Sequence, residues 1–231
     1  MTARAHLFNY ATGDQHQGKP VAEVFQQIHD GSEWNVATTE SVSGEGSTLA
    51  QTATLRSEMP SLLQKLGVSI LLDLPCGDFN WMRHVDLTGI RYMGADIVPT
   101  IVERNQARFG SDNRQFLQLN LLTDPLPSAD LLFCRDCLVH LSLANIQVAL
   151  DNIRHSGITY LATTHFHNEP ENADIPTGGW RPLNFFKPPF IFPQPVAEIN
   201  EHCTEMDGAF EDKCLVVWRV ADLRPTMLDG R

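Results

Sequence analysis

The chain has 231 residues, a length that suits one domain with a small extension. Hydrophobic residues make up 42% and charged residues 19%, a balance that excludes a disordered chain and supplies one sizeable core. The chain has 17 Lys and Arg against 28 Asp and Glu, and this net charge of −11 disfavours a nucleic-acid partner. No apolar run approaches the roughly 20 residues that span a bilayer, and residues 1–18 are too polar for a signal peptide.

The five cysteines are an odd number and lie mostly inside apolar stretches. This pattern favours reduced thiols rather than a disulfide framework. We therefore expect a cytoplasmic protein with no membrane partner.

Residues 1–57 are expected to form an N-terminal extension. Apolar side chains recur at helical spacing over residues 20–28, which predicts a short helix. The Gly/Ser-rich stretch 41–48 has two interpretations. It is either a mobile connection or a lid whose backbone amides meet an anion.

From residue 58 to residue 231 we expect one domain in which nearly all-apolar strands alternate with helices. This alternation predicts a parallel sheet covered on both faces, and right-handed crossovers make it doubly wound. Ligands then bind at the carboxyl ends of the strands. The expected helices are 59–66, 100–109 and 143–155, and the expected strands are 68–74, 91–97, 115–120, 129–134, 158–164 and 214–220.

Three residues near the first two strands indicate the ligand. Asp73 closes the first strand, Gly77 lies in the following turn, and Asp96 closes the second strand. A carboxylate at the end of the second strand accepts hydrogen bonds from ribose hydroxyls, and a glycine turn allows close approach of a ligand to the backbone. A carboxylate on the first strand adds an acceptor for a cationic group. Together they predict an adenosine ligand.

The run 74–79 also indicates which adenosine ligand is bound. It keeps one glycine, whereas a dinucleotide site uses three, and Asp78 would repel a pyrophosphate. A nicotinamide-dependent oxidoreductase is therefore disfavoured. S-adenosylmethionine has no phosphate, and its sulfonium and ammonium groups suit a site with carboxylates.

At these residues the chain resembles the class I S-adenosylmethionine-dependent methyltransferases. The run 71–79 is similar to their first motif, 93–97 to the second, and 129–140 to the fourth. The resemblance covers residues 58–166 and implies a Rossmann-like, seven-stranded, mostly parallel sheet with an antiparallel edge strand. The sequence departs from the family at Pro75 and Phe79, which replace turn glycines, and at Asn120, which replaces an acidic residue.

The resemblance implies S-adenosylmethionine as cofactor and nine contact residues. These are Asp73, Pro75, Gly77, Trp81, Asp96, Ile97, Asn120, Leu121 and Arg135.

Three residues beyond the fourth and fifth strands are candidates for a catalytic base: Asp136, His140 and His165. Two metal alternatives arise from the same segments, but we predict no metal. A zinc site at Cys134, Cys137 and His140 would lack a second pair of ligands. The other alternative groups His165 with His167 and Glu169.

Residues 167–195 are rich in aromatic residues and prolines, and we interpret them as a substrate lid in which Arg181 or Lys187 meets an anion. The predicted activity is methyl transfer to a small-molecule acceptor, with a sugar or other hydroxyl preferred. The alternative is a nucleoside-binding module without turnover. The sequence does not indicate the oligomeric state.

Overall fold

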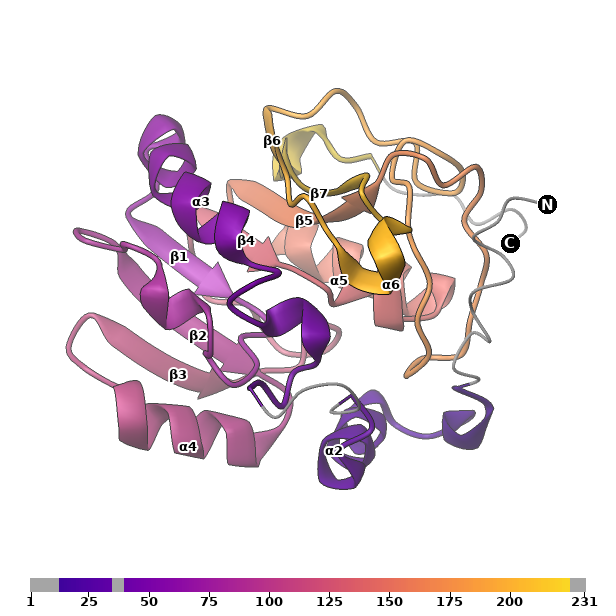
Figure 1. Cartoon of the computed structure of the whole chain (residues 1–231), viewed down its shortest axis with the longest axis horizontal. Coiled ribbons are helices and arrows are strands. Elements are labelled where there is room, and N and C mark those ends of the chain that lie inside the picture. The colour runs from indigo at the N-terminus through magenta and orange to yellow at the C-terminus, as the bar shows by residue number, and fades with distance from the viewer. Residues whose placement is uncertain (1–12, 35–39, 225–231) are drawn as a thin grey trace.

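The computed structural model describes residues 13–34 and 40–224 of the chain. Within these ranges a seven-stranded sheet has the strand order β3-β2-β1-β4-β5-β7-β6 (Figure 1). The strands are β1 (Ile70–Asp73), β2 (Arg91–Asp96), β3 (Arg114–Gln118), β4 (Leu131–Cys134), β5 (Tyr160–Phe166), β6 (Ala197–Asn200) and β7 (Lys213–Arg219).

Helices connect most of these strands. No helix in the described ranges is long and apolar enough to cross a bilayer. The α-helices are α2 (Val21–Gly31), α3 (Ala53–Leu66), α4 (Pro99–Phe109), α5 (Leu143–His155) and the single turn α6 (Glu205–Gly208). The 3-10 turns are Gly13–His16, Glu45–Ser47, Met82–His84, Leu138–His140 and Val220–Asp222.

The strand directions confirm the predicted doubly wound sheet. Strands β1 to β5 pair in parallel, whereas β7 is antiparallel to both β5 and β6. The predicted strand 214–220 is therefore present, but it lies inside the sheet. The edge position belongs to β6, which the sequence analysis did not predict.

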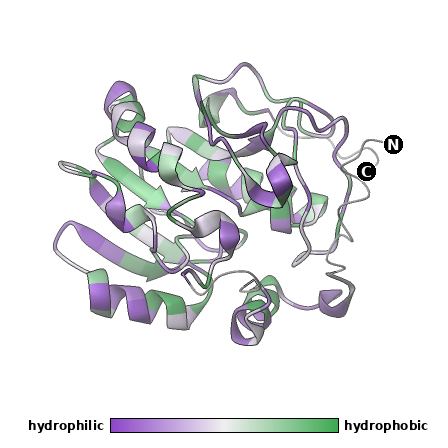
Figure 2. Cartoon of the chain, viewed as in Figure 1, coloured by the Kyte–Doolittle hydropathy of each residue, from purple (hydrophilic) through white to green (hydrophobic). Residues whose placement is uncertain are grey.

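Apolar side chains alternate between two cores, one on each face of the sheet. Leu71 packs with α3 and α4 on one face, whereas Leu72 packs with α5 on the other. Successive residues of a strand point to opposite faces, and helices cover both faces here, so both side chains are fully buried. In Figure 2 the central strands are largely green, and purple residues lie along the outer surfaces of the helices.

Two helix ends follow from local chemistry. The Ser142 hydroxyl accepts a hydrogen bond from the Asn145 backbone at 3.2 Å and caps α5, which has the predicted bounds. Helix α3 ends at Gly67, whose φ is +68°. This helix starts earlier than predicted and keeps Pro60 inside it.

The topology brings distant parts of the chain to one edge of the sheet. Strands β1, β2, β4 and β5 end at this edge, and β6 ends there too because it runs in the same direction as β5. Strand β7 starts there, since Lys213 pairs with Phe166 at the end of β5. Polar residues near 73, 96, 135, 201 and 213 are thereby placed close together.

Candidate active site

A cavity opens at this carboxyl edge, and we call it the first cavity. It contains about 1220 Å³ of space free of protein atoms, counted to its open mouth, which is ample for a nucleoside ligand. All nine residues predicted to contact the cofactor line it: Asp73, Pro75, Gly77, Trp81, Asp96, Ile97, Asn120, Leu121 and Arg135.

The turn after β1 has residues in the left-handed backbone region, although Pro75 and Phe79 stand where the related family has glycines. Gly77 has a φ of +53°, in the left-handed region. Two positions later Phe79 also has a positive φ, of 58°, despite its bulky side chain. Its ring packs on Tyr92 and Phe116 at centroid distances of 5.1 and 5.2 Å. Aromatic packing therefore maintains a conformation for which the sequence resemblance predicts glycine.

Asp96 is fixed at the end of β2 by two backbone donors. Its Oδ2 accepts from the Gly77 N–H at 3.1 Å, and its Oδ1 accepts from the Val98 N–H at 3.0 Å. Burial raises the pKa of Asp96 to about 6, although these two donors act in the opposite direction. The carboxylate faces the first cavity in one orientation, which fits the hydroxyl donors of a ribose.

Asp73 is a second buried acid in the first cavity. It accepts a hydrogen bond from the Tyr92 hydroxyl at 2.5 Å. Burial raises the pKa of Asp73 to about 8, and the neighbouring Asp96 carboxylate adds to the shift. A cationic ligand group beside Asp73 would stabilise its ionised form, so this residue fits the ammonium of S-adenosylmethionine.

The far end of the first cavity is apolar with one amide. Asn120 lies there beside Ile97 and Leu121. Its Oδ1 accepts from the Leu122 N–H at 2.9 Å, and its own N–H donates to Asp124 at 2.9 Å. These bonds fix the loop after β3, and the neighbouring Ile97 and Leu121 give an adenine ring apolar contacts.

Residues 40–52 lie over the turn after β1, and we call them the cover segment. The Val42 N–H donates to Asp78 Oδ2 at 2.9 Å, and the Ser41 hydroxyl donates to Asp78 Oδ1 at 3.1 Å. In return the Asp78 N–H donates to the Ser43 hydroxyl at 3.1 Å. A backbone amide of this segment thus contacts an anion, a contact that the lid interpretation of residues 41–48 predicts. The anion is the protein's own Asp78.

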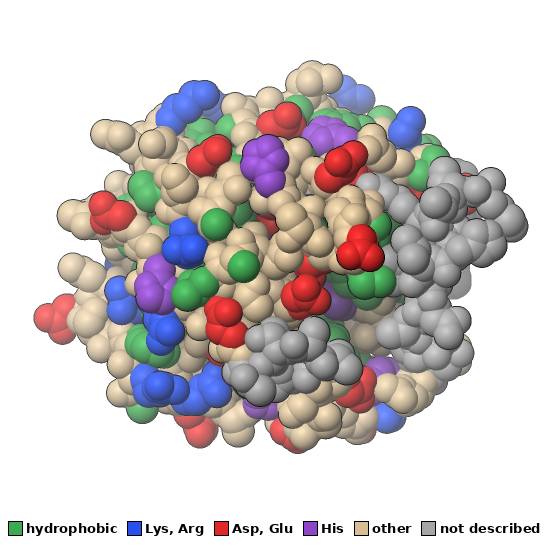
Figure 3. All heavy atoms as spheres, in the orientation of Figure 1, with side chains coloured by type: hydrophobic (Ala, Val, Ile, Leu, Met, Phe, Trp, Pro, Cys, Tyr) green, Lys and Arg blue, Asp and Glu red, His purple; other side chains and the backbone are tan. Residues whose placement is uncertain are grey.

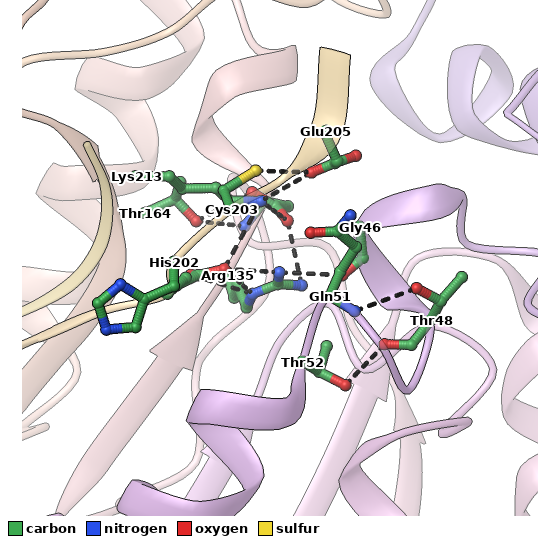
Figure 4. Close-up of polar contacts among 12 residues, drawn as sticks. Gly46, Thr48, Gln51, Thr52, Arg135, Thr164, His202, Cys203, Glu205 and Lys213 are labelled. Carbon is green, nitrogen blue, oxygen red and sulfur yellow. Dashed lines mark hydrogen bonds and ion pairs between the residues drawn. The ribbon is translucent and has the colours of Figure 1, made fainter. Parts of the chain in front are cut away.

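A buried network of charged side chains adjoins the cover segment (Figure 4). Arg135 Nη2 donates to Glu201 at 2.8 Å and to the Gly46 carbonyl at 2.9 Å. Arg135 Nη1 lies 3.1 Å from Asp136, and Lys213 Nζ lies 2.8 Å from the same carboxylate oxygen. Arg135 therefore ties the cover segment to the sheet edge.

This network decides the state of Asp136. Burial would raise its pKa, but Arg135 and Lys213 outweigh burial and hold the pKa of Asp136 well below its ordinary value. The Thr164 hydroxyl also donates to Asp136, at 3.1 Å. A carboxylate that forms ion pairs with two cations is a weak proton acceptor, and the predicted role of Asp136 as a base stays a prediction.

A second cavity continues from the first one. Five residues line both cavities: Trp34, Ser43, Ser47, Asp136 and His140. Beyond them the second cavity extends past the cover segment to Trp180, Phe210 and Glu205. The shared residues therefore mark the junction between the two spaces.

His140 stands at this junction with a defined tautomer. Its Nδ1 lies 2.7 Å from the Gly179 carbonyl, which only accepts, so Nδ1 carries the proton and Nε2 keeps its lone pair. The ring packs on Trp34 at a centroid distance of 4.7 Å. Burial lowers the pKa of His140 to about 4, which keeps the imidazole neutral near pH 7.

His165, the third predicted base, faces away from this junction, which corrects the expectation that all three candidates share one cavity. Side chains alternate along β5: Thr164 reaches Asp136, so its neighbour His165 points to the other face. There its Nδ1 accepts from the Phe185 N–H at 3.1 Å, and its ring lies 6.1 Å from that of Trp218. His165 is thus a buried packing residue.

The described residues contain no group of three His, Cys, Asp or Glu side chains arranged to hold a metal ion. Neither of the two metal alternatives therefore has a ligand set in this part of the chain.

Arg181 also departs from its predicted role. Its guanidinium donates inward to the Leu138, Val139 and Leu141 carbonyls at 3.0, 2.8 and 2.6 Å, so it braces the 167–195 segment.

Sequence reasoning missed the contributions of Glu201, Glu205 and Lys213. Glu201 lies 66 residues from Arg135 and Lys213 lies 77 residues from Asp136, and only the sheet topology brings them together. One signal was available. Lys213 opens an otherwise apolar strand, and a lysine at the start of a buried strand needs a carboxylate partner.

This architecture is the fold of the class I S-adenosylmethionine-dependent methyltransferases. Two solved structures align with TM-scores of 0.58. One is the Burkholderia thailandensis 1,6-didemethyltoxoflavin-N1-methyltransferase with bound 1,6-didemethyltoxoflavin and S-adenosylhomocysteine, at 17% identity over 92% of each chain. The other is the N-methyltransferase NodS from Bradyrhizobium japonicum WM9 in complex with S-adenosylhomocysteine, at 14% identity over 84% of this chain and 98% of that one.

A third structure, human N-acetylserotonin methyltransferase with S-adenosylmethionine, aligns with a TM-score of 0.46 at 18% identity. The alignment covers 71% of this chain but only 47% of the human chain. No protein-family profile and no curated protein matches the sequence. At these identities the structural likeness establishes the fold, and function must be argued from the site.

Proposed function

We propose that this protein is an S-adenosylmethionine-dependent methyltransferase acting on a small-molecule acceptor. The observation that carries the proposal is the fixed, buried carboxylate of Asp96, which faces the first cavity beside the Gly77 turn. Two solved structures that align over 84% and 92% of this chain contain S-adenosylhomocysteine.

The residues of the first cavity would hold the cofactor in three places. Asp96 would accept hydrogen bonds from the ribose, Asp73 would face the ammonium, and Asn120 would lie beside the adenine. S-adenosylmethionine supplies a methyl group made electrophilic by its sulfonium. The protein's task is then to align an acceptor, exclude water and, for a hydroxyl, remove a proton.

For a hydroxyl acceptor, we infer that His140 Nε2 takes the proton. The Gly179 carbonyl fixes its tautomer, and the ring lies where the two cavities meet. Such a base contributes roughly 10²–10⁴-fold to the rate. Because the pKa of His140 is lowered to about 4, the rate should stay level below pH 6.5 and fall only towards pH 4. The preference for a sugar hydroxyl and the cytoplasmic location stay predictions.

Calorimetry with S-adenosylmethionine, S-adenosylhomocysteine and NAD tests the first step. We expect the first two to bind and NAD to fail, because Asp78 and the single glycine disfavour a pyrophosphate. The proposal would be contradicted if NAD bound and neither S-adenosylmethionine nor S-adenosylhomocysteine did.

Formation of S-adenosylhomocysteine across a panel of small hydroxyl and amine acceptors, followed by mass spectrometry, tests turnover. Binding without any product would favour the alternative, a nucleoside-binding module. With a turned-over acceptor in hand, His140→Asn should lower the rate while cofactor affinity stays at the wild-type value.

A further inference from the structure

The second cavity is the space that the proposed function leaves to the acceptor, and its walls restrict what binds there. Three aromatic rings line one side. Phe166, Trp180 and Phe210 contact one another edge-to-face, with centroid distances of 6.0, 5.6 and 5.2 Å. The Trp34 ring, packed on His140, lies at the junction. Phe166 and Phe210 are almost completely buried, whereas Trp180 and Trp34 are half-buried, so the two tryptophans offer the aromatic surface that favours an apolar ring or a cation.

The floor of the second cavity belongs to the buried charged network (Figure 4). Two members are cations, Arg135 and Lys213. Three members are carboxylates: Asp136, Glu201 and Glu205. Among the described residues this network therefore holds one more carboxylate than cations. A buried or half-buried charge without a partner is costly, so a single positive charge from a ligand would complete the network.

Among the carboxylates of this network Glu205 lies farthest from its nearest cation. Lys213 Nζ is 3.7 Å from Glu205 Oε2 but 2.8 Å from Asp136 Oδ2, so Lys213 pairs more closely with Asp136 than with Glu205. The other contact of Glu205 Oε2 is the Cys203 thiol at 3.4 Å, a weak donor. Among the described residues Oε1 accepts no hydrogen bond. The side chain is 24% exposed and lines the second cavity, so it is accessible to a ligand.

The wider surface has the same sign. Glu33 and Glu45 lie at the rim of the second cavity. In Figure 3 acidic side chains lie around the centre of the face, near α6, while the largest group of basic side chains lies at the lower left over α4. An anionic acceptor would meet repulsion on this approach, whereas a cation would be attracted.

We propose that the second cavity selects acceptors carrying one cationic amino group next to a flat apolar face. The ammonium group lies against the Glu205 carboxylate, and the apolar face packs on the half-buried rings of Trp180 and Trp34, which the buried Phe166 and Phe210 support from behind. This inference rests on the proposed function and specifies the substrate class of the same site. It assigns Glu205 as a specificity residue.

Two isosteric probes test the charge requirement: benzylamine, which is cationic at pH 7, and benzyl alcohol, which is neutral. Their affinities are measured by calorimetry on the full chain saturated with S-adenosylhomocysteine. We expect benzylamine to bind about tenfold more tightly, because a desolvated cation gains from both the carboxylate and the rings. Equal affinities, or tighter binding of the alcohol, would overturn the inference.

Glu205→Gln tests the residue, with Glu103→Gln on the exposed side of α4 as the matched control. The first variant should reduce the preference for benzylamine to about the value for the alcohol, and the control should keep it. A preference that survives in Glu205→Gln would overturn the assignment. Unchanged S-adenosylhomocysteine affinity shows that the Glu205 variant is folded. Failure of the wild type to bind S-adenosylhomocysteine would instead contradict the proposed function, before any amine is added.

Discussion

Replacing Gly77 by alanine tests whether the cover segment touches the turn after β1 as the structure has it. The new Cβ would overlap the Ser43 hydroxyl and lie 3.1 Å from the Ser43 Cβ, so the cover segment must shift. The shift removes the hydrogen bond from the Asp78 N–H to Ser43, worth about 1 kcal/mol. The left-handed backbone at Gly77 adds roughly 1–2 kcal/mol for any L side chain.

Gly67→Ala isolates the contact, because Gly67 has a similar φ of +68° and nothing within 4 Å of the added Cβ. We expect Gly77→Ala to cost about 1 kcal/mol more in unfolding free energy than Gly67→Ala, measured by urea titration of tryptophan fluorescence. In a Ser43→Gly background, which lacks the hydrogen bond to Ser43 already, Gly77→Ala should cost no more than Gly67→Ala. If both alanine variants cost the same in a wild-type background, the cover segment does not lie on Gly77.

Three further predictions concern the site. Asp96→Ala should weaken S-adenosylhomocysteine binding by about 1.5–3 kcal/mol in calorimetry, and unchanged affinity would remove Asp96 from the ribose site. Glu201→Gln removes the carboxylate that accepts from Arg135 Nη2, so that the buried guanidinium keeps only its ion pair with Asp136, and should lower the unfolding free energy by about 1–3 kcal/mol. Glu198→Gln, on the exposed side of β6, should change it by less than about 0.5 kcal/mol, and equal effects would contradict the buried pair. Burial lowers the pKa of His140 from 6.5 to about 4. Between pH 4 and pH 6.5 the folded state therefore binds fewer protons than the unfolded state, and the wild type gains stability as the pH rises through this range. The difference in unfolding free energy between wild type and His140→Gln should therefore grow from pH 4 to pH 6.5 and then level off, and a difference independent of pH would refute the burial.

Strong local patterns predicted most of the fold. Helix α5 has the expected bounds because an amphipathic run follows a Ser142 cap, and the parallel strands are continuous apolar runs. Strand β6 was missed because its four residues, Ala197–Asn200, bury only Ile199 well and carry no apolar run. It is a strand because β7 offers it a pairing edge, which is tertiary information.

The site divides in the same way. The cofactor residues follow β1, β2 and β3 within a few positions, so a motif in the sequence locates them. The acceptor side combines Arg135 and Asp136 with residues near 201 and 213, which no short motif connects. His165 shows a different limit. The end of its strand was predicted correctly, but the register, which points Thr164 to the site and His165 to the core, depends on pairing with β7.

The C-terminal position of β6 and β7 has a consequence for how the protein is made. Gln51 of the cover segment exchanges hydrogen bonds with Thr204, 153 residues later in the chain. A ribosome releases these two partners far apart in time, and the first four strands of the sheet can pair before β7 exists. The nascent chain therefore completes its cofactor turn early but cannot close the second cavity until Lys213 has emerged. Assembly of the acceptor side is therefore the final, long-range step of folding, and the same step completes both cores, since β7 contributes buried residues to each.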